Sequence, residues 1–385
     1  MRKFVLPLIF VAVGCCFITY SFLDTFVIPK NTKKVNLDNN IDDFFNQSIP
    51  NNPPFSSKPS SNPISSNATS QITSETSTPS TSQPQLESPT YYEDKTPEEI
   101  EALFTSEVVF KEYEHYSDPD IYINITTHRD EEDTTTYYVA DIRLKSLSYL
   151  RAALAHDTFG ENVEERTSDI CKRKKGILAI NGDYYGAQEA GYVLRNGEIL
   201  RNTISKSESF GNKDHPRKNP EDLAIYRDGT FEIFNEHDYS LEEIAAKGAW
   251  QVFSFGPGLI ENGQIAVAEN EEVETALSGG RNQRTAIGII APLHYVFVVN
   301  NGRLTDEKGF SLYKLATIMS DLHCYNAYNF DGGGSSTMYL DDGTGNANRL
   351  GHLVNKPNQN YYTHGTSTNV QQRGVSDIVY IGKES

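Results

Sequence analysis

The chain has 385 residues, of which 22% are charged, a composition normal for one large or two ordinary globular domains. Its formal net charge is −18, which argues against a protein that binds the phosphate backbone of DNA or RNA, because no general basic surface would hold a polyanion. An anionic ligand would need a local basic pocket.

A hydrophobic segment opens the chain. Residues 4–23 are uncharged, and as a helix rising ~1.5 Å per residue they match a hydrocarbon core of ~30 Å. Two basic residues precede the segment and favour a cytoplasmic N-terminus, although Lys33 and Lys34 on the far side weaken this orientation. We predict a single-pass membrane anchor over residues 1–30, with the rest of the chain extracytoplasmic. A cleaved signal peptide is the alternative.

A polar stretch follows the hydrophobic segment. Between residues 41 and 90, 32 of 50 residues are Asn, Pro, Ser or Thr. Such a composition is too polar to bury a core. We therefore predict a disordered linker over residues 31–95, which would space the folded part from the membrane.

Cysteine usage is compatible with an exported protein. Two of the four cysteines lie in the hydrophobic segment, which leaves Cys171 and Cys324 in the folded part. They form either one disulfide or two separate buried thiols, and the sequence leaves both possibilities open.

The segment from residue 96 onward carries signals for both helices and strands. Helices are expected after Thr96, over residues 240–248 with a capping pair, and over residues 311–322, where apolar residues recur at helical spacing. Four dipeptides typical of hairpin turns are Asn196-Gly197, Asp228-Gly229, Asn262-Gly263 and Asn301-Gly302. We predict one α+β domain over residues 96–385, with a mixed, largely antiparallel sheet and packed helices.

The first of four polar clusters follows a strand-like apolar run at residues 177–180 and contains Asn181, Gly182, Asp183 and Tyr184. The simplest interpretation is a turn, in which Asn and Gly supply backbone freedom. Adjacent tyrosines beside a carboxylate also suit a sugar site, because aromatic faces pack on pyranose rings and carboxylates accept hydroxyl hydrogens. The residues alone leave both interpretations open.

Two further clusters lie in the middle of the folded part. Gly256 belongs to "FGPG", which on its own is a tight bend. Arg281 and Arg284 stand before an apolar strand that begins near Thr285, in an otherwise acidic chain. An arginine can grip a phosphate through two parallel hydrogen bonds, and a surface ion pair is the alternative.

The fourth cluster, "NFDGGGSSTMY" at residues 329–339, combines Asp331 with three consecutive glycines. Successive glycines can aim several backbone N–H groups at one anion. The nucleotide motif GxxxxGK[ST] and the hydrolase motif GxSxG are both absent from the sequence. A glycine-rich strand end that permits close packing is the alternative. The sequence has neither HExxH nor paired CxxC motifs, so we predict no metal and no cofactor.

Taken together, the clusters form an ordered set. In the order "AINGDYYG", "FGPGLIENG", "RTAIGI", "NFDGGGSSTMY" and "QQRGVSDIVYI", the chain resembles the phosphodiester glycosidase family. The resemblance extends from about Val139 to Ile381, and the DGGGSST block is its most distinctive part. Asp183 departs from the glycine that many members carry after Asn-Gly. The resemblance implies hydrolysis of a sugar from a phosphodiester, at the bond between the anomeric carbon and the phosphate oxygen.

The resemblance and the residue types together suggest roles for individual residues. As catalytic residues we predict Asp331, with Asp183 as its rival for nucleophile, base or transition-state stabiliser, and Arg284 as a phosphate ligand. We expect these three side chains to converge on one cleft. Because phosphate is already a weakly basic leaving group, the need for a second carboxyl as general acid is relaxed. The predicted substrate-binding residues are Asn181, Gly182, Tyr184, Gly256, Thr285, Gly332, Gly333, Gly334, Ser335, Ser336 and Arg373.

Two other functions remain open. The chain is alternatively a non-catalytic module that binds cell-wall polymer or exopolysaccharide, or a phosphodiesterase that cuts the other ester bond and leaves sugar-1-phosphate. For an anchored, exported enzyme, the expected partner is a phosphoglycan or sugar-1-phosphodiester of the cell envelope or exopolysaccharide.

Overall fold

The computed structural model describes residues 28–39, 41–46, 89–205, 221–269, 280–304, 306–345, 351–357 and 372–383. The predicted membrane segment lies outside these residues, as does most of the predicted linker. Within the described ranges, no helix is both long and apolar enough to cross a membrane.

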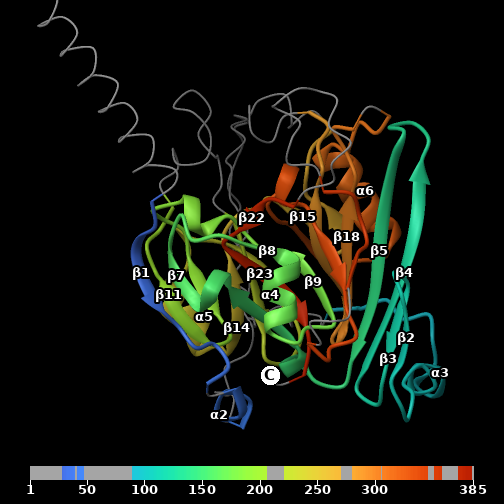
Figure 1. Cartoon of the computed structure of the whole chain (residues 1–385), viewed down its shortest axis with the longest axis horizontal. Helices are drawn as coiled ribbons and strands as arrows, with labels where there is room; N and C mark the ends of the chain where they lie inside the picture. The colour runs from blue at the N-terminus through green and yellow to red at the C-terminus, as the bar shows by residue number, and fades with distance from the viewer. Residues whose placement is uncertain are drawn as a thin grey trace, which may run out of the picture.

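Three antiparallel sheets form the body of the described structure (Figure 1). The largest has the strand order β16-β15-β19-β17-β18-β5-β4-β3-β2, and two five-stranded sheets have the orders β11-β10-β14-β12-β13 and β21-β20-β9-β23-β6. Two short ribbons, β1-β7 and β22-β8, complete the pairing. The predicted largely antiparallel character is confirmed, but the single mixed sheet is not: the described strands form several sheets, and all the described pairs are antiparallel.

The strands of the nine-stranded sheet are β2 (Val109–Lys111), β3 (His115–Ser117), β4 (Ile121–Asp130), β5 (Thr135–Leu144), β15 (Gly258–Glu261), β16 (Gln264–Ile265), β17 (Thr285–Ala291), β18 (His294–Asn300) and β19 (Asn326–Asn329). The first five-stranded sheet comprises β10 (Val193–Arg195), β11 (Glu198–Arg201), β12 (Glu221–Tyr226), β13 (Phe231–Asn235) and β14 (Ala249–Phe253). The second comprises β6 (Leu150–Leu154), β9 (Leu178–Asn181), β20 (Met338–Leu340), β21 (His352–Leu353) and β23 (Asp377–Ile381).

The two ribbons are formed by β1 (Lys30–Lys34), β7 (Thr158–Glu161), β8 (Glu165–Arg166) and β22 (Gly374–Val375). The α-helices are α2 (Ile41–Asn46), α3 (Pro97–Glu101), α4 (Thr167–Arg173), α5 (Leu241–Ala246) and α6 (Leu312–Asp321). Single 3₁₀ turns are η1 (Leu147–Tyr149), η2 (Ala155–Asp157), η3 (Tyr185–Ala187) and η5 (Gly333–Ser335).

The centre of the nine-stranded sheet is buried on both faces. β17 and β18 read TAIGIIA and HYVFVVN and are buried almost throughout, which explains why their apolar runs are continuous rather than alternating. One face packs beneath α6, where Leu315 and Met319 join Ala286 and Val298. The other face contributes to a core that all three sheets share. Because all three sheets pack on this shared core, the ends of their strands are held at fixed positions relative to one another.

Local sequence signals placed most helix and turn boundaries correctly. α3 and α5 begin with complete capping boxes, in which Thr96 and Ser240 are the capping residues. The turns β10–β11, β12–β13 and β15–β16 contain the predicted Asn-Gly or Asp-Gly dipeptides. The fourth prediction is wrong, because β18 pairs with β17 and β5, and Asn301-Gly302 opens a loop toward α6. Asn301 is buried in that loop, and its backbone N–H donates to the Thr136 carbonyl at 2.9 Å.

The start of the predicted linker is folded, which corrects the boundary at residue 31. Residues 28–39 and 41–46, here called the N-terminal strap, run along the domain as β1 and α2 (Figure 1). β1 pairs with β7, and Phe44 and Phe45 of α2 pack on Trp250 with ring centroids 4.9 and 4.8 Å away. A few apolar side chains are therefore enough to dock this polar segment on the domain, because they pack against apolar residues that the domain already provides.

The far end of the predicted linker is ordered as well. Glu93 accepts two hydrogen bonds from the guanidinium of Arg143, at 2.8 and 2.9 Å. This charged pair lowers the pKa of Glu93 to about 2. Tyr91 packs edge-on against Tyr325. Residues 89–95 therefore belong to the folded part, and residues 47–88 lie outside the described residues.

The two cysteines of the folded part are separate thiols. Cys171 is buried beneath the second five-stranded sheet, and Cys324 is buried beside α6. Burial raises the pKa of each thiol. The structure therefore contains two free buried cysteines where the sequence left a disulfide open.

Candidate functional site

The site lies at the seam where strands from two sheets end side by side. Asn181 closes β9, and its amide nitrogen donates to the carbonyl of Asp331 at 2.8 Å. Its amide oxygen accepts from the hydroxyl of Thr285 at 2.8 Å and from the backbone N–H of Thr337 at 3.2 Å. The N–H of Asp331 also donates to the carbonyl of Gly182 at 3.4 Å. The buried Asn181 side chain thus fixes the backbone that carries Asp331.

Asp331 is paired with Arg373, which comes from the segment before β22. The Nη2 of Arg373 lies 2.7 Å from Oδ2 of Asp331, and its Nε donates to the hydroxyl of Ser335 at 2.8 Å. The guanidinium also sits 5.5 Å from the centre of the Tyr184 ring. The Asp331 and Arg373 side chains are 12% and 33% exposed, so a ligand can reach both.

Burial and charge act in opposite directions at this pair. Burial disfavours the charged form of Arg373, but the Asp331 carboxylate outweighs burial and raises the pKa of the guanidinium. Burial also raises the pKa of Tyr184, with Arg373 opposing it. The site therefore holds a permanent cation and a neutral aromatic hydroxyl beside a carboxylate, which is a suitable arrangement for an anionic sugar derivative.

The glycine run is shaped by close packing as well as by its amides. The N–H of Gly332 donates to Asp331 Oδ1 at 2.8 Å, and that of Gly333 donates to the Gln283 carbonyl at 2.9 Å. A Cβ on Gly332 would lie 2.8 Å from the Gln283 carbonyl oxygen, and Gly333 has a φ of +62°. Two of the three predicted anion-binding amides thus already have acceptors, which leaves Gly334 as the remaining glycine amide of the predicted set.

Unsatisfied polar atoms gather around the same run. Ser336 Oγ, Thr337 Oγ1 and both amide atoms of Gln283 are buried and have no hydrogen-bond partner in the described part of the chain. Leaving such a group unpaired costs ~1–3 kcal/mol in a folded protein. These atoms are unused hydrogen-bonding capacity buried beside the glycine run.

Asp183 lies in a buried ion network rather than beside Asp331. Its Oδ2 accepts from Arg195 Nη2 at 2.7 Å and from the backbone N–H of Ser254 at 3.0 Å. Arg195 also pairs with Asp377 at 2.8 Å, and the side chains of all three charged residues are fully buried. Burial and the charge of Asp183 raise the pKa of Asp377, although Arg195 opposes them. This geometry suits Asp183 to holding the "NGD" turn in place.

Arg284 is engaged by main-chain carbonyls. Its Nε donates to Phe310 at 3.2 Å, and its Nη2 donates to Gly280 at 3.1 Å. Gly256 contributes a carbonyl that accepts from the amide of Asn329 at 2.9 Å. The expected cluster of Asp183, Arg284 and Asp331 is thus replaced by a pair in which Arg373 holds the aspartate.

Two charged residues at the site were missed by the sequence reasoning. Arg303 places its Nη1 3.7 Å from where a Cβ on Gly333 would lie, so a second guanidinium stands at the glycine run. Glu164 interacts electrostatically with both Asp331 and Arg373. Neither residue lies in a recognisable motif: Arg303 follows the dipeptide that was predicted to form a hairpin, and Glu164 lies in a charged loop.

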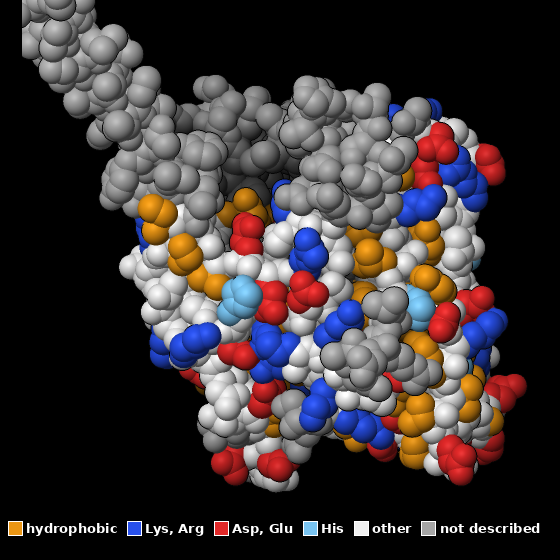
Figure 2. Space-filling model, viewed as in Figure 1, with side chains coloured by type: hydrophobic (Ala, Val, Ile, Leu, Met, Phe, Trp, Pro, Cys, Tyr) orange, Lys and Arg blue, Asp and Glu red, His pale blue; other side chains and the backbone are white. Residues whose placement is uncertain are grey.

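Basic and acidic side chains of the described residues are interspersed on the face shown in Figure 2. Among the described residues there is no group of three or more His, Cys, Asp or Glu side chains that could hold a metal ion.

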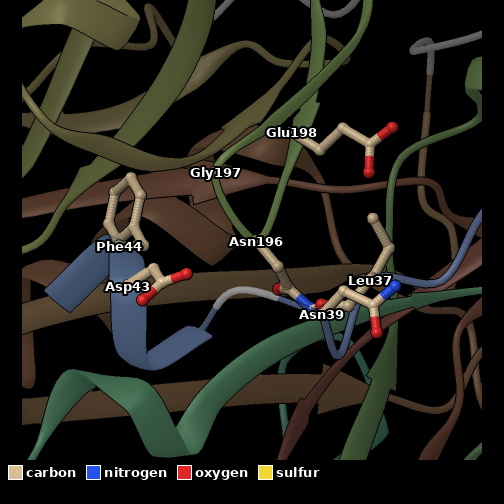
Figure 3. A pocket seen from close by; sticks show the side chains of 7 residues that line it. All are labelled: Leu37, Asn39, Asp43, Phe44, Asn196, Gly197 and Glu198. Atoms are coloured by element: carbon tan, nitrogen blue, oxygen red, sulfur yellow. Dashed lines mark hydrogen bonds between the residues drawn. The ribbon is translucent and has the colours of Figure 1, made fainter.

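A hollow of about 650 Å³ lies elsewhere, between the N-terminal strap and the β10–β11 hairpin (Figure 3). Its lining residues are Leu37, Asn39, Asp43, Phe44, Asn196, Gly197 and Glu198. It shares no residue with the Asp331 site, so we assign the candidate function to the seam and not to this hollow.

The chain is similar in sequence and in fold to known proteins. The chain is similar to the SPbeta prophage-derived uncharacterized protein YomE of Bacillus subtilis (strain 168), with 24% identity over 239 residues. That alignment covers 58% of this chain and 36% of the relative, so the chain spans little more than a third of that protein's length. The fold of the present chain is similar to that of the catalytic domain of zebrafish N-acetylglucosamine-1-phosphodiester alpha-N-acetylglucosaminidase, auto-inhibited by its pro-peptide.

The structural match has a TM-score of 0.50 at 19% identity and covers 77% of this chain and 96% of the zebrafish chain. A family model described as phosphodiester glycosidase matches residues 174–381, which include Asp331, Arg373 and the glycine run. The matched span is more than half of the chain, and the chain belongs to the phosphodiester glycosidase family.

Proposed function

We propose that this protein is an extracytoplasmic hydrolase that cleaves the bond between sugar C1 and the phosphate oxygen of a glycosyl phosphodiester. The observation that carries the proposal is the partly exposed Asp331–Arg373 pair at the glycine run, with Tyr184 against the guanidinium. Membership of the phosphodiester glycosidase family supports the reaction class.

Some residues at the seam would bind the phosphate of the substrate, and others would bind the sugar. Arg373, with Arg303 across the glycine run, would bind the phosphate and stabilise the charge that collects on it as the C1–O bond breaks. Tyr184 offers an aromatic face to the sugar ring. Ser336 and Thr337 have free hydroxyls that suit sugar hydroxyl groups.

Asp331 is positioned for the sugar carbon. Its backbone is fixed by Asn181, and its carboxylate is oriented by Arg373 and by the N–H of Gly332. In this role it stabilises the oxocarbenium-like transition state, attacks C1 or activates water. A phosphate that takes over the guanidinium of Arg373 would leave the carboxylate free to face C1.

We further propose that the hydrophobic residues 4–23 anchor the protein in a membrane and that the substrate is a phosphoglycan of the cell envelope or exopolysaccharide. The support is the length and apolar character of that segment in the sequence. Protease digestion of intact and of permeabilised cells tests the orientation. Degradation of the folded domain only after permeabilisation would rule out the extracytoplasmic placement.

The reaction is tested with the full chain and a panel of methyl phosphodiesters of hexose and N-acetylhexosamine 1-phosphates. The expected products are free sugar and methyl phosphate. Sugar-1-phosphate and methanol would instead identify a phosphodiesterase that cuts the other ester bond. Saturable binding of a panel member without either product would identify a binding module, and both of these outcomes overturn the proposal.

A further inference from the structure

The side chain of Glu164 packs against the backbone of Gly374, the residue that follows Arg373. Glu164 lies in the link between β7 and β8, and β8 and β22 are labelled side by side in Figure 1. β8 pairs with β22, so Glu165 lies opposite Val375 and Arg166 lies opposite Gly374. A Cβ at Gly374 would lie 2.8 Å from the Cβ of Glu164 and 3.0 Å from its Oε2. The carboxyl therefore packs against the residue that directly follows Arg373.

The two carboxyl groups of the site have different partners. Asp331 is held by Arg373 and by the N–H of Gly332, whereas the carboxyl of Glu164 forms no hydrogen bond or ion pair within the described part of the chain. Burial of the Glu164 carboxyl and the nearby charge of Asp331 raise its pKa, and Arg373 opposes them. Tyr184 faces the same group and carries no charge.

When two carboxyl groups of one site lie in different surroundings, they can take different roles in acid–base chemistry. The Asp331 carboxylate is fixed by its ion pair with Arg373 and by the N–H of Gly332. Burial raises the pKa of the unpaired Glu164 carboxyl, so this group binds a proton more readily than an ordinary glutamate does and, with no hydrogen-bond partner among the described residues, is free to transfer it.

We propose that Glu164 is the proton donor to the leaving phosphate oxygen, a role that rests on the proposed function. The C1–O bond breaks with its electron pair on the phosphate oxygen, and the Glu164 proton passes to the departing phosphomonoester. Water supplies the oxygen that bonds to C1, either directly or after attack by Asp331. One proton of that water returns to Glu164, so the site is restored and no further reactant is needed.

The chemistry of the leaving group gives this proton transfer a purpose. A phosphodiester has one negative charge, and the phosphomonoester leaves with two unless it is protonated. Its second pKa is ~6, and general acid catalysis works best when donor and acceptor have similar pKa values near the working pH. A carboxyl whose pKa is raised above that of ordinary glutamate fits this acceptor. The second carboxyl that the sequence analysis treated as dispensable therefore has a use.

The test compares two substrates in the full chain. For the sugar that the wild type releases fastest, the methyl phosphodiester is compared with the glycosyl fluoride of the same anomer, because fluoride needs little protonation to leave. Glu164→Gln should lower kcat/KM for the phosphodiester by ~10²–10⁴-fold and that for the fluoride by less than ~10-fold. Glu161→Gln, the same change three residues earlier in β7, should leave both unchanged.

The pH profile is a second readout that a merely structural role would not move. Because Glu164 acts in its protonated form, the wild-type kcat/KM should fall as the pH rises through its pKa. Glu164→Asp should keep this alkaline decline, and Glu164→Gln should lose it. Equal losses on both substrates, no loss on either, or an unchanged alkaline decline in Glu164→Gln would overturn the role of Glu164. Absence of sugar release by the wild type would instead overturn the proposed function.

Discussion

Asp331→Asn is expected to separate activity from stability. The substitution keeps the shape of the side chain but removes the charge that faces Arg373 at 2.7 Å and the proposed charge beside C1. Loss of a catalytic carboxylate lowers kcat/KM by ~10³–10⁵-fold, or ~4–7 kcal/mol of transition-state stabilisation. Because the Arg373 side chain is 33% exposed, the lost ion pair should cost only ~0–1 kcal/mol of unfolding free energy.

Asp183→Asn is the matched variant, since it makes the same change two residues beyond Asn181. Its carboxylate is fully buried and neutralises part of the charge of Arg195. Breaking a buried pair costs ~3–5 kcal/mol. Asp183→Asn should therefore lower stability strongly, while its folded fraction keeps sugar release within ~10-fold of the wild type.

The assay measures sugar release and urea unfolding on the same preparations, at a temperature where each variant is folded. Wild-type turnover by Asp331→Asn would refute its assignment. An activity loss in folded Asp183→Asn as large as that of Asp331→Asn would show that the buried carboxylate is part of the reaction.

Three further substitutions test other parts of the structure. Arg195→Met should lower the unfolding free energy by ~3–5 kcal/mol, because its two buried carboxylate partners lose their cation; a midpoint in urea equal to that of the wild type would contradict this. Phe44→Ala should release the N-terminal strap and shift the fluorescence of Trp250, the single tryptophan, to longer wavelength, at a cost of ~1–3 kcal/mol; an unchanged emission maximum would argue against docking. Arg373→Lys should raise KM for a phosphodiester by ~10-fold or more, because a lysine cannot reproduce the forked contact with Asp331 and a phosphate; an unchanged KM would assign phosphate binding elsewhere.

Sequence signals that involve only a few neighbouring residues predicted the local structure correctly in most cases. The predicted cap at Thr96, the capping pair at Ser240 and the turn at Asn196-Gly197 were correct, because a cap or a two-residue turn is decided by residues within one turn of each other. Asn301-Gly302 has the same local signal but opens a loop, because the next named element along the described chain is α6 and not a strand that pairs with β18. Tertiary pairing overrode the local preference there.

The linker boundary failed for a related reason. Composition averaged over 41–90 is too polar for an independent core, but Phe44 and Phe45 need no core of their own when Trp250 is already in place. Docking of a short apolar pair on a preformed surface leaves almost no trace in composition.

By itself, the sequence determined the family, because the family motifs are contiguous stretches of residues, and it located the aspartate–glycine block at residues 331–334. Only the tertiary structure decided which charge faces which. Arg373 rather than Arg284 holds Asp331, Asp183 is neutralised by Arg195, and the partners of these ion pairs lie from 12 to 42 residues apart. Pairing over such separations follows from sheet register and burial, which bring distant side chains within 3 Å and which no local pattern encodes.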